Sequence, residues 1–199
     1  MKILIAIPTF ENILPEVFQA IYNLDKGGHD VDFRFVKGYD CAKARNVISK
    51  KAMDGGYDYV MMVDSDTIVP KDAITNMLNP VADVVMGCCP RKNTKDRMTA
   101  LFSAKDNLKG KGFHVAMSYD ELQSEERIEL KGGGFACVLI NTKVFEKMVY
   151  PYFKYVVHED GSALSEDLYF CVNAKKAGFR IEADPRVKCG HLARYFQYE

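Results

Sequence analysis

Two aspartates that follow a short apolar run are the residues of this chain best placed to do chemistry. Asp64 and Asp66 flank Ser65, directly after the run Tyr59–Val63. Five consecutive apolar residues bounded by polar ones predict a buried, parallel strand. Ligands of open α/β sheets bind beyond the carboxyl ends of such strands. Residues i and i+2 of an extended segment face the same way, so the two carboxylates would converge on one point. Such a pair needs a cation, a proton or water between its charges, and a hard divalent ion that also bridges to substrate phosphates meets that need.

The same aspartates also suit a structural role. Asp-Ser-Asp-Thr followed by Pro70 is good turn and helix-cap chemistry. The spacing alone therefore leaves metal binding and capping open, and the rest of the chain has to decide between them.

A second acidic pair opens a predicted helix. Glu166 and Asp167 follow Ser165, the expected N-cap of that helix. Acidic side chains in a first turn are favoured by the helix dipole, which gives them a structural explanation. A carboxylate fixed at such a place beside a pocket is also a candidate general base.

Three further groups are ambiguous when each is taken alone. His191 is a single histidine, which is more often a packed or surface residue than a ligand. The run Gly132–Gly134 precedes a strand, whereas a phosphate-binding loop follows a strand and opens a helix. These glycines therefore allow close approach of a ligand or make an ordinary turn. Arg45, near the start of a predicted helix, could bind a phosphate bidentately.

The elements that would position these residues alternate between strand and helix over the first 90 residues. Alternating or wholly apolar runs predict strands, and helical spacing with proline and glycine signals predicts helices. The expected elements are the strand Lys2–Ile7, the helix Leu14–Leu24, the strand Val31–Phe35, the helix Ala42–Met53, the strand Tyr59–Val63, the helix Lys71–Leu78 and the strand Asp83–Met86. This alternation predicts β-α-β units and a parallel sheet with right-handed crossovers.

The second half of the chain is less regular. The polar segment Thr94–Glu129 predicts loops or a small antiparallel flap, with one strand at Phe113–Met117. The elements expected after it are the strand Phe135–Ile140, the helix Thr142–Met148, the helix Ser165–Ala177 and the strand Phe179–Ala183. No linker or repeat divides the chain, so we expect a single domain over residues 1–199.

Composition excludes several classes of function. The chain has 199 residues, of which 48% are hydrophobic and 27% charged, and its formal net charge is zero. Without a global basic field, a nucleic-acid partner is not expected. No run approaches 18 apolar residues, so no transmembrane segment is expected. The six cysteines form no C-x-x-C pair, which disfavours structural zinc and predicts buried, reduced thiols in the cytoplasm.

Taken in chain order, the motifs resemble one enzyme family. The segments are Ile7–Asn12, Ala44–Asn46, Val63–Asp66, Gly133–Phe135, Ser165–Asp167 and the late His191. Together they are similar to GT-A fold glycosyltransferases, closest to the family 2 type, over Ile3 to His191. The resemblance implies a Rossmann-like, mostly parallel central sheet flanked by helices, with a small antiparallel element in the second half. Within the one domain, residues 1–90 would bind the nucleotide, and residues 91–199 would bind the acceptor and complete the metal site.

The resemblance also implies a role for each candidate residue. The nucleotide-sugar donor, most readily a UDP-sugar, would contact Pro8, Thr9, Glu11, Asp40, Arg45, Asp64 and Ser65. Mn²⁺ or Mg²⁺ would be bound by Asp66 and His191, with Asp64 nearby. The acceptor, a glycan, protein or small molecule, would lie on Gly133, Gly134 and Phe135. Asp167, beside Glu166, matches the base of inverting members, so the implied activity is metal-dependent transfer of a sugar to an acceptor hydroxyl.

Two departures from the family pattern keep alternatives open. Lys37–Asp40 stands where the family usually has a paired acidic motif that reads the base, and the chain has no Trp near the acceptor site. One alternative is a sugar nucleotidyltransferase, although Ile7–Asn12 lacks the glycines and basic residues of its phosphate loop. The other is a non-catalytic module that binds a nucleotide sugar or acts in assembly.

Overall fold

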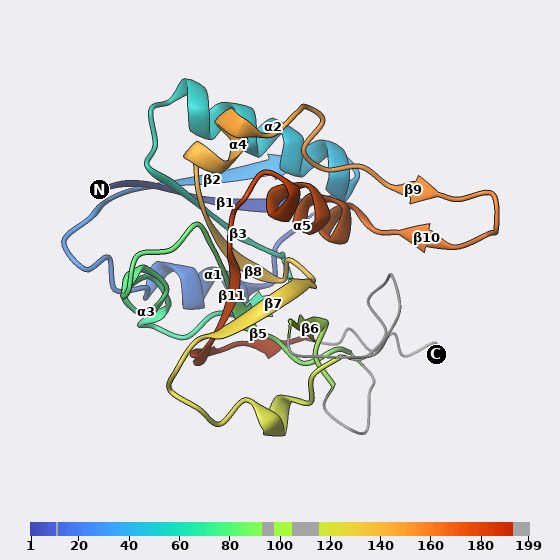
Figure 1. Cartoon of the computed structure of the whole chain (residues 1–199). Helices are drawn as coiled ribbons and strands as arrows, with labels where there is room; N and C mark the ends of the chain where they lie inside the picture. The colour runs from blue at the N-terminus through green and yellow to red at the C-terminus, as the bar shows by residue number, and fades with distance from the viewer. Residues whose placement is uncertain (11, 93–97, 105–115, 193–199) are drawn as a thin grey trace, which may run out of the picture.

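The central feature of the fold is an eight-stranded sheet (Figure 1). The structure is a computed structural model, which describes residues 1–10, 12–92, 98–104 and 116–192. In spatial order the strands are β2 (Asp30–Lys37), β1 (Lys2–Thr9), β3 (Tyr59–Val63), β8 (Cys137–Asn141), β5 (Val84–Cys88), β11 (Ile181–Lys188), β7 (Ile128–Gly133) and β6 (Leu101–Ser103). Strands β7 and β8 run opposite to the other six. The predicted mostly parallel α/β sheet is therefore confirmed.

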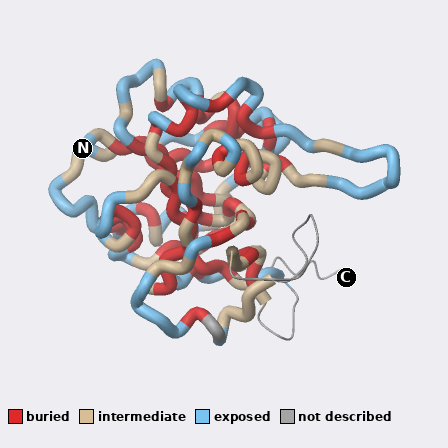
Figure 2. Tube along the Cα trace, viewed as in Figure 1, coloured by how far each residue is buried: buried red, intermediate tan, exposed pale blue. Residues whose placement is uncertain are grey.

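Helices cover both faces of this sheet, so the molecule has three layers. One apolar cluster joins the sheet to α2 (Cys41–Asp54), α4 (Lys143–Lys147) and α5 (Glu166–Lys176). A second cluster on the other face joins it to α1 (Pro15–Tyr22) and α3 (Ala73–Leu78). Figure 2 shows the buried residues concentrated along the sheet between these layers. Because all five residues of β3 are buried, Asp64 is the first residue at which this central strand can present a polar side chain.

Local signals in the first half account for its elements. Helix α1 begins at Pro15, whose missing N–H is tolerated in the first turn. Helix α2 begins after Asp40, whose Oδ1 accepts a hydrogen bond of 2.9 Å from the Lys43 amide. It ends at the pair Gly55-Gly56, and Gly56 takes the positive φ of 63° that favours glycine. Each predicted element before residue 90 is present, with boundaries that differ by at most two residues.

The second half departs from the predicted boundaries. The glycine run does not form a turn before a strand, because Gly132 and Gly133 lie inside β7, which pairs with β6 as an antiparallel flap. The last long strand runs to Lys188 and not to Ala183, since its later residues pair with β5 across an irregularity in the register. Of the predicted strand Phe113–Met117, residues 113–115 lie outside the described residues, and 116–117 are not in a strand.

Short strands bring the end of the described chain to the candidate site. β12 (Gly190–His191) pairs with β4 (Thr67–Ile68), so that His191 lies opposite Thr67, directly after the two aspartates. A two-stranded hairpin of β9 (Val156–Val157) and β10 (Ala163–Leu164) projects from the body next to α5 (Figure 1). No helix in the described part of the chain is long and apolar enough to cross a membrane.

Candidate functional site

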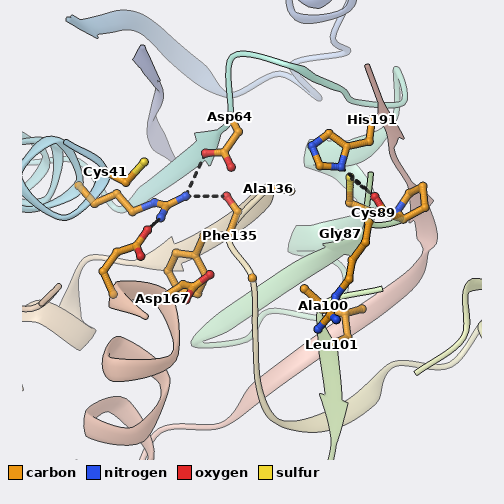
Figure 3. A pocket seen from close by; sticks show the side chains of 15 residues that line it. Cys41, Asp64, Gly87, Cys89, Ala100, Leu101, Phe135, Ala136, Asp167 and His191 are labelled. Atoms are coloured by element: carbon orange, nitrogen blue, oxygen red, sulfur yellow. Dashed lines mark hydrogen bonds and ion pairs between the residues drawn. The ribbon is translucent and has the colours of Figure 1, made fainter. Parts of the chain in front are cut away.

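Two adjoining cavities lie at the ends of β1, β3 and β5. The central pocket has a volume of about 230 Å³ and the outer pocket one of about 290 Å³. Cys41 and Asp64 line both, so the two form one continuous site. The central pocket is lined by Cys41, Arg45, Asp64, Gly87, Cys89, Pro90, Arg91, Ala100, Leu101, Gly134, Phe135, Ala136, Glu166, Asp167 and His191 (Figure 3). The outer pocket is lined by Pro8, Thr9, Phe10, Tyr39, Asp40, Cys41, Asp64, Ser65 and Asp66.

The site gathers most of the residues that the sequence singled out. Of the candidates for donor binding, Pro8, Thr9, Asp40, Asp64 and Ser65 line the outer pocket, and Arg45 lines the central one. The candidates for catalysis, with Gly134 and Phe135, line the central pocket. Glu11 lies outside the described residues. Gly133 lines neither pocket: a Cβ there would come within 2.8 Å of both Leu101 Cδ2 and Met86 Sδ, so the glycine is required by packing. At Gly134 a Cβ would lie 3.0 Å from Ala100 Cβ and 3.5 Å from Asp167 Oδ2, which leaves open backbone beside the acid.

A buried arginine organises the central pocket. Arg45 is 3% exposed, and its guanidinium donates to Asp64 Oδ1 at 2.9 Å, to the Phe135 carbonyl at 3.3 Å and to Glu166 Oε1. Its buried Nε has no hydrogen-bond partner among the described residues. A buried donor without a partner is unfavourable, so the polar contacts of this guanidinium are incomplete. The guanidinium therefore joins Asp64, which follows β3, to Glu166 in the first turn of α5.

The carboxylates around Arg45 are held with raised proton affinity. Burial raises the pKa of Glu166 above 4.5, and the opposing attraction of Arg45 does not offset it. Burial likewise raises the pKa of Asp64 against the effect of Arg45, although 34% of its side chain is exposed to the pocket. Perturbation of this kind is frequent at functional sites, because binding and proton transfer need groups that are not fully satisfied.

The second aspartate belongs to a different cluster. The Thr67 amide donates to the Asp64 carbonyl at 3.1 Å, so Asp64–Thr67 is a turn and not an extended segment. The extended geometry that the sequence predicted for this segment is therefore wrong, although both aspartates line the outer pocket. Asp66 instead forms ion pairs with Lys92 and with His191 Nε2, the latter at 3.4 Å. Although burial acts to raise the pKa of Asp66, hydrogen bonds from His191 and Lys92 lower it to about 2.

His191 is oriented as a ligand histidine would be. Its Nδ1 lies 2.8 Å from the Pro90 carbonyl, and its Nε2 faces Asp66. A backbone carbonyl at one ring nitrogen is the arrangement that directs the other toward a metal. The hydrogen bond to Asp66 raises the pKa of His191 to about 10. The protonated imidazole therefore balances the negative charge of the Asp66 carboxylate.

The residues present fit a divalent ion that is also held by a substrate. Mg²⁺ and similar ions use one or two protein side chains together with substrate phosphates and water. Asp66 and His191 form such a pair, and the Lys92 ammonium stands at the carboxylate as a cation would. Among the residues that the structure describes, no group of three or more His, Cys, Asp or Glu side chains is arranged to hold a metal alone.

Asp167 and the remaining acids are fixed by local contacts. Asp167 Oδ1 accepts from its neighbour Ser165 Oγ and, at 2.7 Å, from the Leu168 amide. Ser165 thus occupies the N-cap position without making the predicted side-chain cap to α5. Asp40 is likewise occupied in capping α2, which weakens its assignment as a reader of the base.

Sequence reasoning missed several residues in and around this site. Phe10 and Tyr39, which are 71% and 38% exposed, line the outer pocket. Lys92 follows strand β5, and the rule that drew attention to Asp64 would have drawn attention to it. Cys41 and Tyr155 carry no sequence signal: Cys41 joins the two pockets, and the Tyr155 hydroxyl bonds to Glu166.

The arrangement of the whole chain matches known structures. No protein-family model and no curated protein matches it. Among solved structures, A197 from STIV is 18% identical with a TM-score of 0.63, over 98% of this chain and 87% of that one. S. aureus TarS in complex with UDP-GlcNAc is 16% identical with a TM-score of 0.56, over 99% and 60%. GalNAc-T7 with UDP, GalNAc and Mn²⁺ is 9% identical with a TM-score of 0.64, over 98% and 43%. TarS and GalNAc-T7 are glycosyltransferases, and the chain has their GT-A fold.

Proposed function

We propose that this protein is a glycosyltransferase that moves a sugar from a nucleotide-sugar donor to an acceptor hydroxyl, with inversion at the sugar carbon. The observation that carries the proposal is the continuous site in which Asp66, Asp64 and Asp167 lie beyond the central strands of a GT-A sheet. The UDP-sugar and UDP bound to structures of the same fold support UDP as the nucleotide.

The donor would occupy both pockets. The nucleoside would lie in the outer pocket on Pro8 and Thr9, where the exposed rings of Phe10 and Tyr39 offer stacking surfaces. Asp64 and Ser65 would contact the ribose, and the Arg45 guanidinium, in the wall of the central pocket, would lie near the diphosphate. The sugar would then project into the central pocket toward Phe135 and Asp167.

Transfer requires a charge on the leaving diphosphate to be stabilised and a proton to be removed from the acceptor. Asp66 and His191 would hold Mn²⁺ or Mg²⁺, and the bound ion would stabilise the charge on the leaving diphosphate. Lys92 and Arg91 lie at the same edge and add positive charge there. Asp167 would accept the proton of the acceptor hydroxyl, which Gly134 allows to approach because it has no side chain.

Two features of the site disfavour the alternatives, a nucleotidyltransferase and a non-catalytic module. The loop after β1 offers no basic residue among those described, which disfavours a nucleotidyltransferase. A binding or assembly module would not require Asp167 beside an open glycine backbone. We therefore favour the transferase.

A thermal-shift panel of nucleoside diphosphates, with and without Mn²⁺, tests the proposal. A ligand at a hundredfold excess over Kd stabilises the native state by about 2.7 kcal/mol. UDP with Mn²⁺ should raise Tm in the parent and not in Asp66→Ala. The matched control is Asp72→Ala, at the start of α3, where the carboxylate makes no capping bond and lines neither pocket. No shift with any nucleotide, or the same Mn²⁺ dependence in Asp66→Ala, would refute the proposal.

A further inference from the structure

The outer edge of the sheet is a strand whose sequence is complementary to itself. β2 is the terminal strand, and no other strand in the described part of the chain pairs with its outer side. An eight-residue edge of this kind presents unpaired backbone donors and acceptors, and it is a template for pairing with another chain. Phe35 on this strand is 45% exposed and stacks edge-to-face on Phe33, with ring centroids 4.7 Å apart.

The two faces of β2 differ in chemistry. Val31 and Phe33 pack against the apolar cluster under α1 and α3, and Phe35 shares their face because strand residues alternate. Asp30, Asp32 and Arg34 lie on the opposite face, where the Tyr57 hydroxyl donates to Asp32 at 2.5 Å. The edge strand therefore has an apolar row on one face and, on the other, two carboxylates followed by a guanidinium.

We propose that a second copy of this chain pairs with β2, so that two sheets join antiparallel across a two-fold axis at Phe33. A two-fold axis perpendicular to the sheet keeps each face on its own side, so opposed residues must share a face. With the axis at Phe33, Asp32 of each copy lies opposite Arg34 of the other, and Val31 of each copy lies opposite Phe35 of the other. Phe33 of one copy lies opposite Phe33 of the other.

The neighbouring registers are disfavoured by charge. An axis at Asp32 places that carboxylate opposite its own copy, and an axis at Arg34 does the same with the guanidinium. Like charges directly opposed across strands are destabilising, whereas opposite charges and aromatic or β-branched pairs each stabilise by about 0.2–1 kcal/mol. Charge on an edge strand commonly prevents association. An axis at Asp32 also places Asp30 opposite Arg34, but only the axis at Phe33 forms attractive pairs with no like charges directly opposed. The edge therefore fits a second copy of itself.

Paired charge variants test this proposal independently of any enzymatic activity. Sedimentation velocity over a range of concentrations should show that the parent dimerises. Arg34→Asp and Asp32→Arg should each weaken dimerisation by about tenfold or more, because two attractive pairs become repulsive. When the two variants are mixed, each introduced charge faces its opposite, so a heterodimer should form at parental strength.

Two controls make the outcome decisive. Reversal of the exposed Lys51 on α2, as Lys51→Asp, should leave the dimer unchanged. If Asp32→Arg fails to fold because it loses the Tyr57 contact, Arg34→Asp and Arg34→Lys decide, because both keep Asp32: the first should dissociate, and the second, which keeps the positive charge, should dimerise like the parent. A parent that is monomeric at all concentrations, or a mixture that does not associate, overturns the proposal.

Discussion

The molecule contains two buried clusters of arginine and carboxylate side chains, and they differ in how many of their polar atoms have hydrogen-bond partners. Around Asp184, which is fully buried, Arg127 and Arg186 donate from three guanidinium nitrogens and one backbone amide at 2.7–3.2 Å. Around Arg45, one nitrogen has no partner and both carboxylates face a pocket.

The same contrast appears in the proton affinities. Burial acts to raise the pKa of Asp184, but hydrogen bonds from Arg186 and Arg127 reverse the shift and lower it. Burial raises the pKa of Glu166, and Arg45 does not reverse it. A fully satisfied cluster stabilises a fold, whereas one left incomplete at a pocket is suited to binding and proton transfer. The comparison predicts that changes at one cluster affect stability and changes at the other affect activity.

The largest effect should come from the candidate base. General-base catalysis contributes about a hundredfold to ten-thousandfold, so Asp167→Asn should lower kcat for transfer, followed as UDP release, by that amount. Donor affinity should be nearly unchanged, because the lost interaction forms chiefly in the transition state. Asp72→Asn is the control. Near-parental turnover in Asp167→Asn would place the base elsewhere, with Glu166 as the next residue to test.

Removal of the arginine at the satisfied cluster should instead lower stability. Arg127 also donates to the carbonyls of Asn76 and Met77 at 2.9 and 2.7 Å, and it lines neither pocket. Loss of one partner from a buried ion pair lowers the free energy of unfolding by about 3–5 kcal/mol. Urea unfolding of Arg127→Met should show this loss, while UDP affinity measured well below the unfolding transition stays parental. A large change in UDP affinity would contradict the division between the clusters.

The pH dependence of stability should have opposite signs at the two clusters. A folded-state pKa below the unfolded value gives Asp184 a contribution that is lost as pH falls below 3.8. A folded-state pKa above the unfolded value gives Glu166 a contribution that is lost as pH rises above 4.5. Each difference of one in pKa changes the free energy of unfolding by about 1.4 kcal/mol.

Urea unfolding on either side of these two pH values measures the effect. The free energy of unfolding of the parent minus that of Asp184→Asn should decrease as pH is lowered. The free energy of unfolding of the parent minus that of Glu166→Gln should decrease as pH is raised. If both differences change in the same direction with pH, the proposed electrostatic difference between the clusters is wrong.

The smallest effect concerns the lysine at the candidate metal site. Lys92 is about one-third exposed and must leave Asp66 before a metal ion can bind. Partly exposed ion pairs contribute about 0.2–1 kcal/mol, so Lys92→Met should tighten Mn²⁺ binding by roughly two- to fivefold. Titration calorimetry with Mn²⁺ alone measures this directly, and Lys51→Met is the control. Weaker binding in Lys92→Met would mean that the lysine supports the metal site.

The sequence could predict the elements but only part of the site. Continuous apolar runs identified β1 and β3, because these central strands are buried on both faces, and helical spacing identified α2. It could not predict that Gly132 and Gly133 lie within β7, since this depends on their pairing with Phe102 and Leu101 of β6. Nor could it show that Asp64 and Asp66 form ion pairs with different partners. Those partners, Arg45 and Lys92, come from distant segments of the chain.

The most direct test of the account uses Cys41, the thiol shared by both pockets. It is exposed, whereas the other five cysteines are buried. Its alkylation rate therefore reports whether the site is filled, and Cys41→Ser identifies the signal. With UDP-GlcNAc and Mn²⁺ at about ten times the Kd, alkylation of Cys41 should slow by roughly tenfold, because only the free protein reacts. An unchanged rate under UDP-GlcNAc and other nucleotide sugars, up to their solubility limits, would contradict the assignment of this site as the donor pocket.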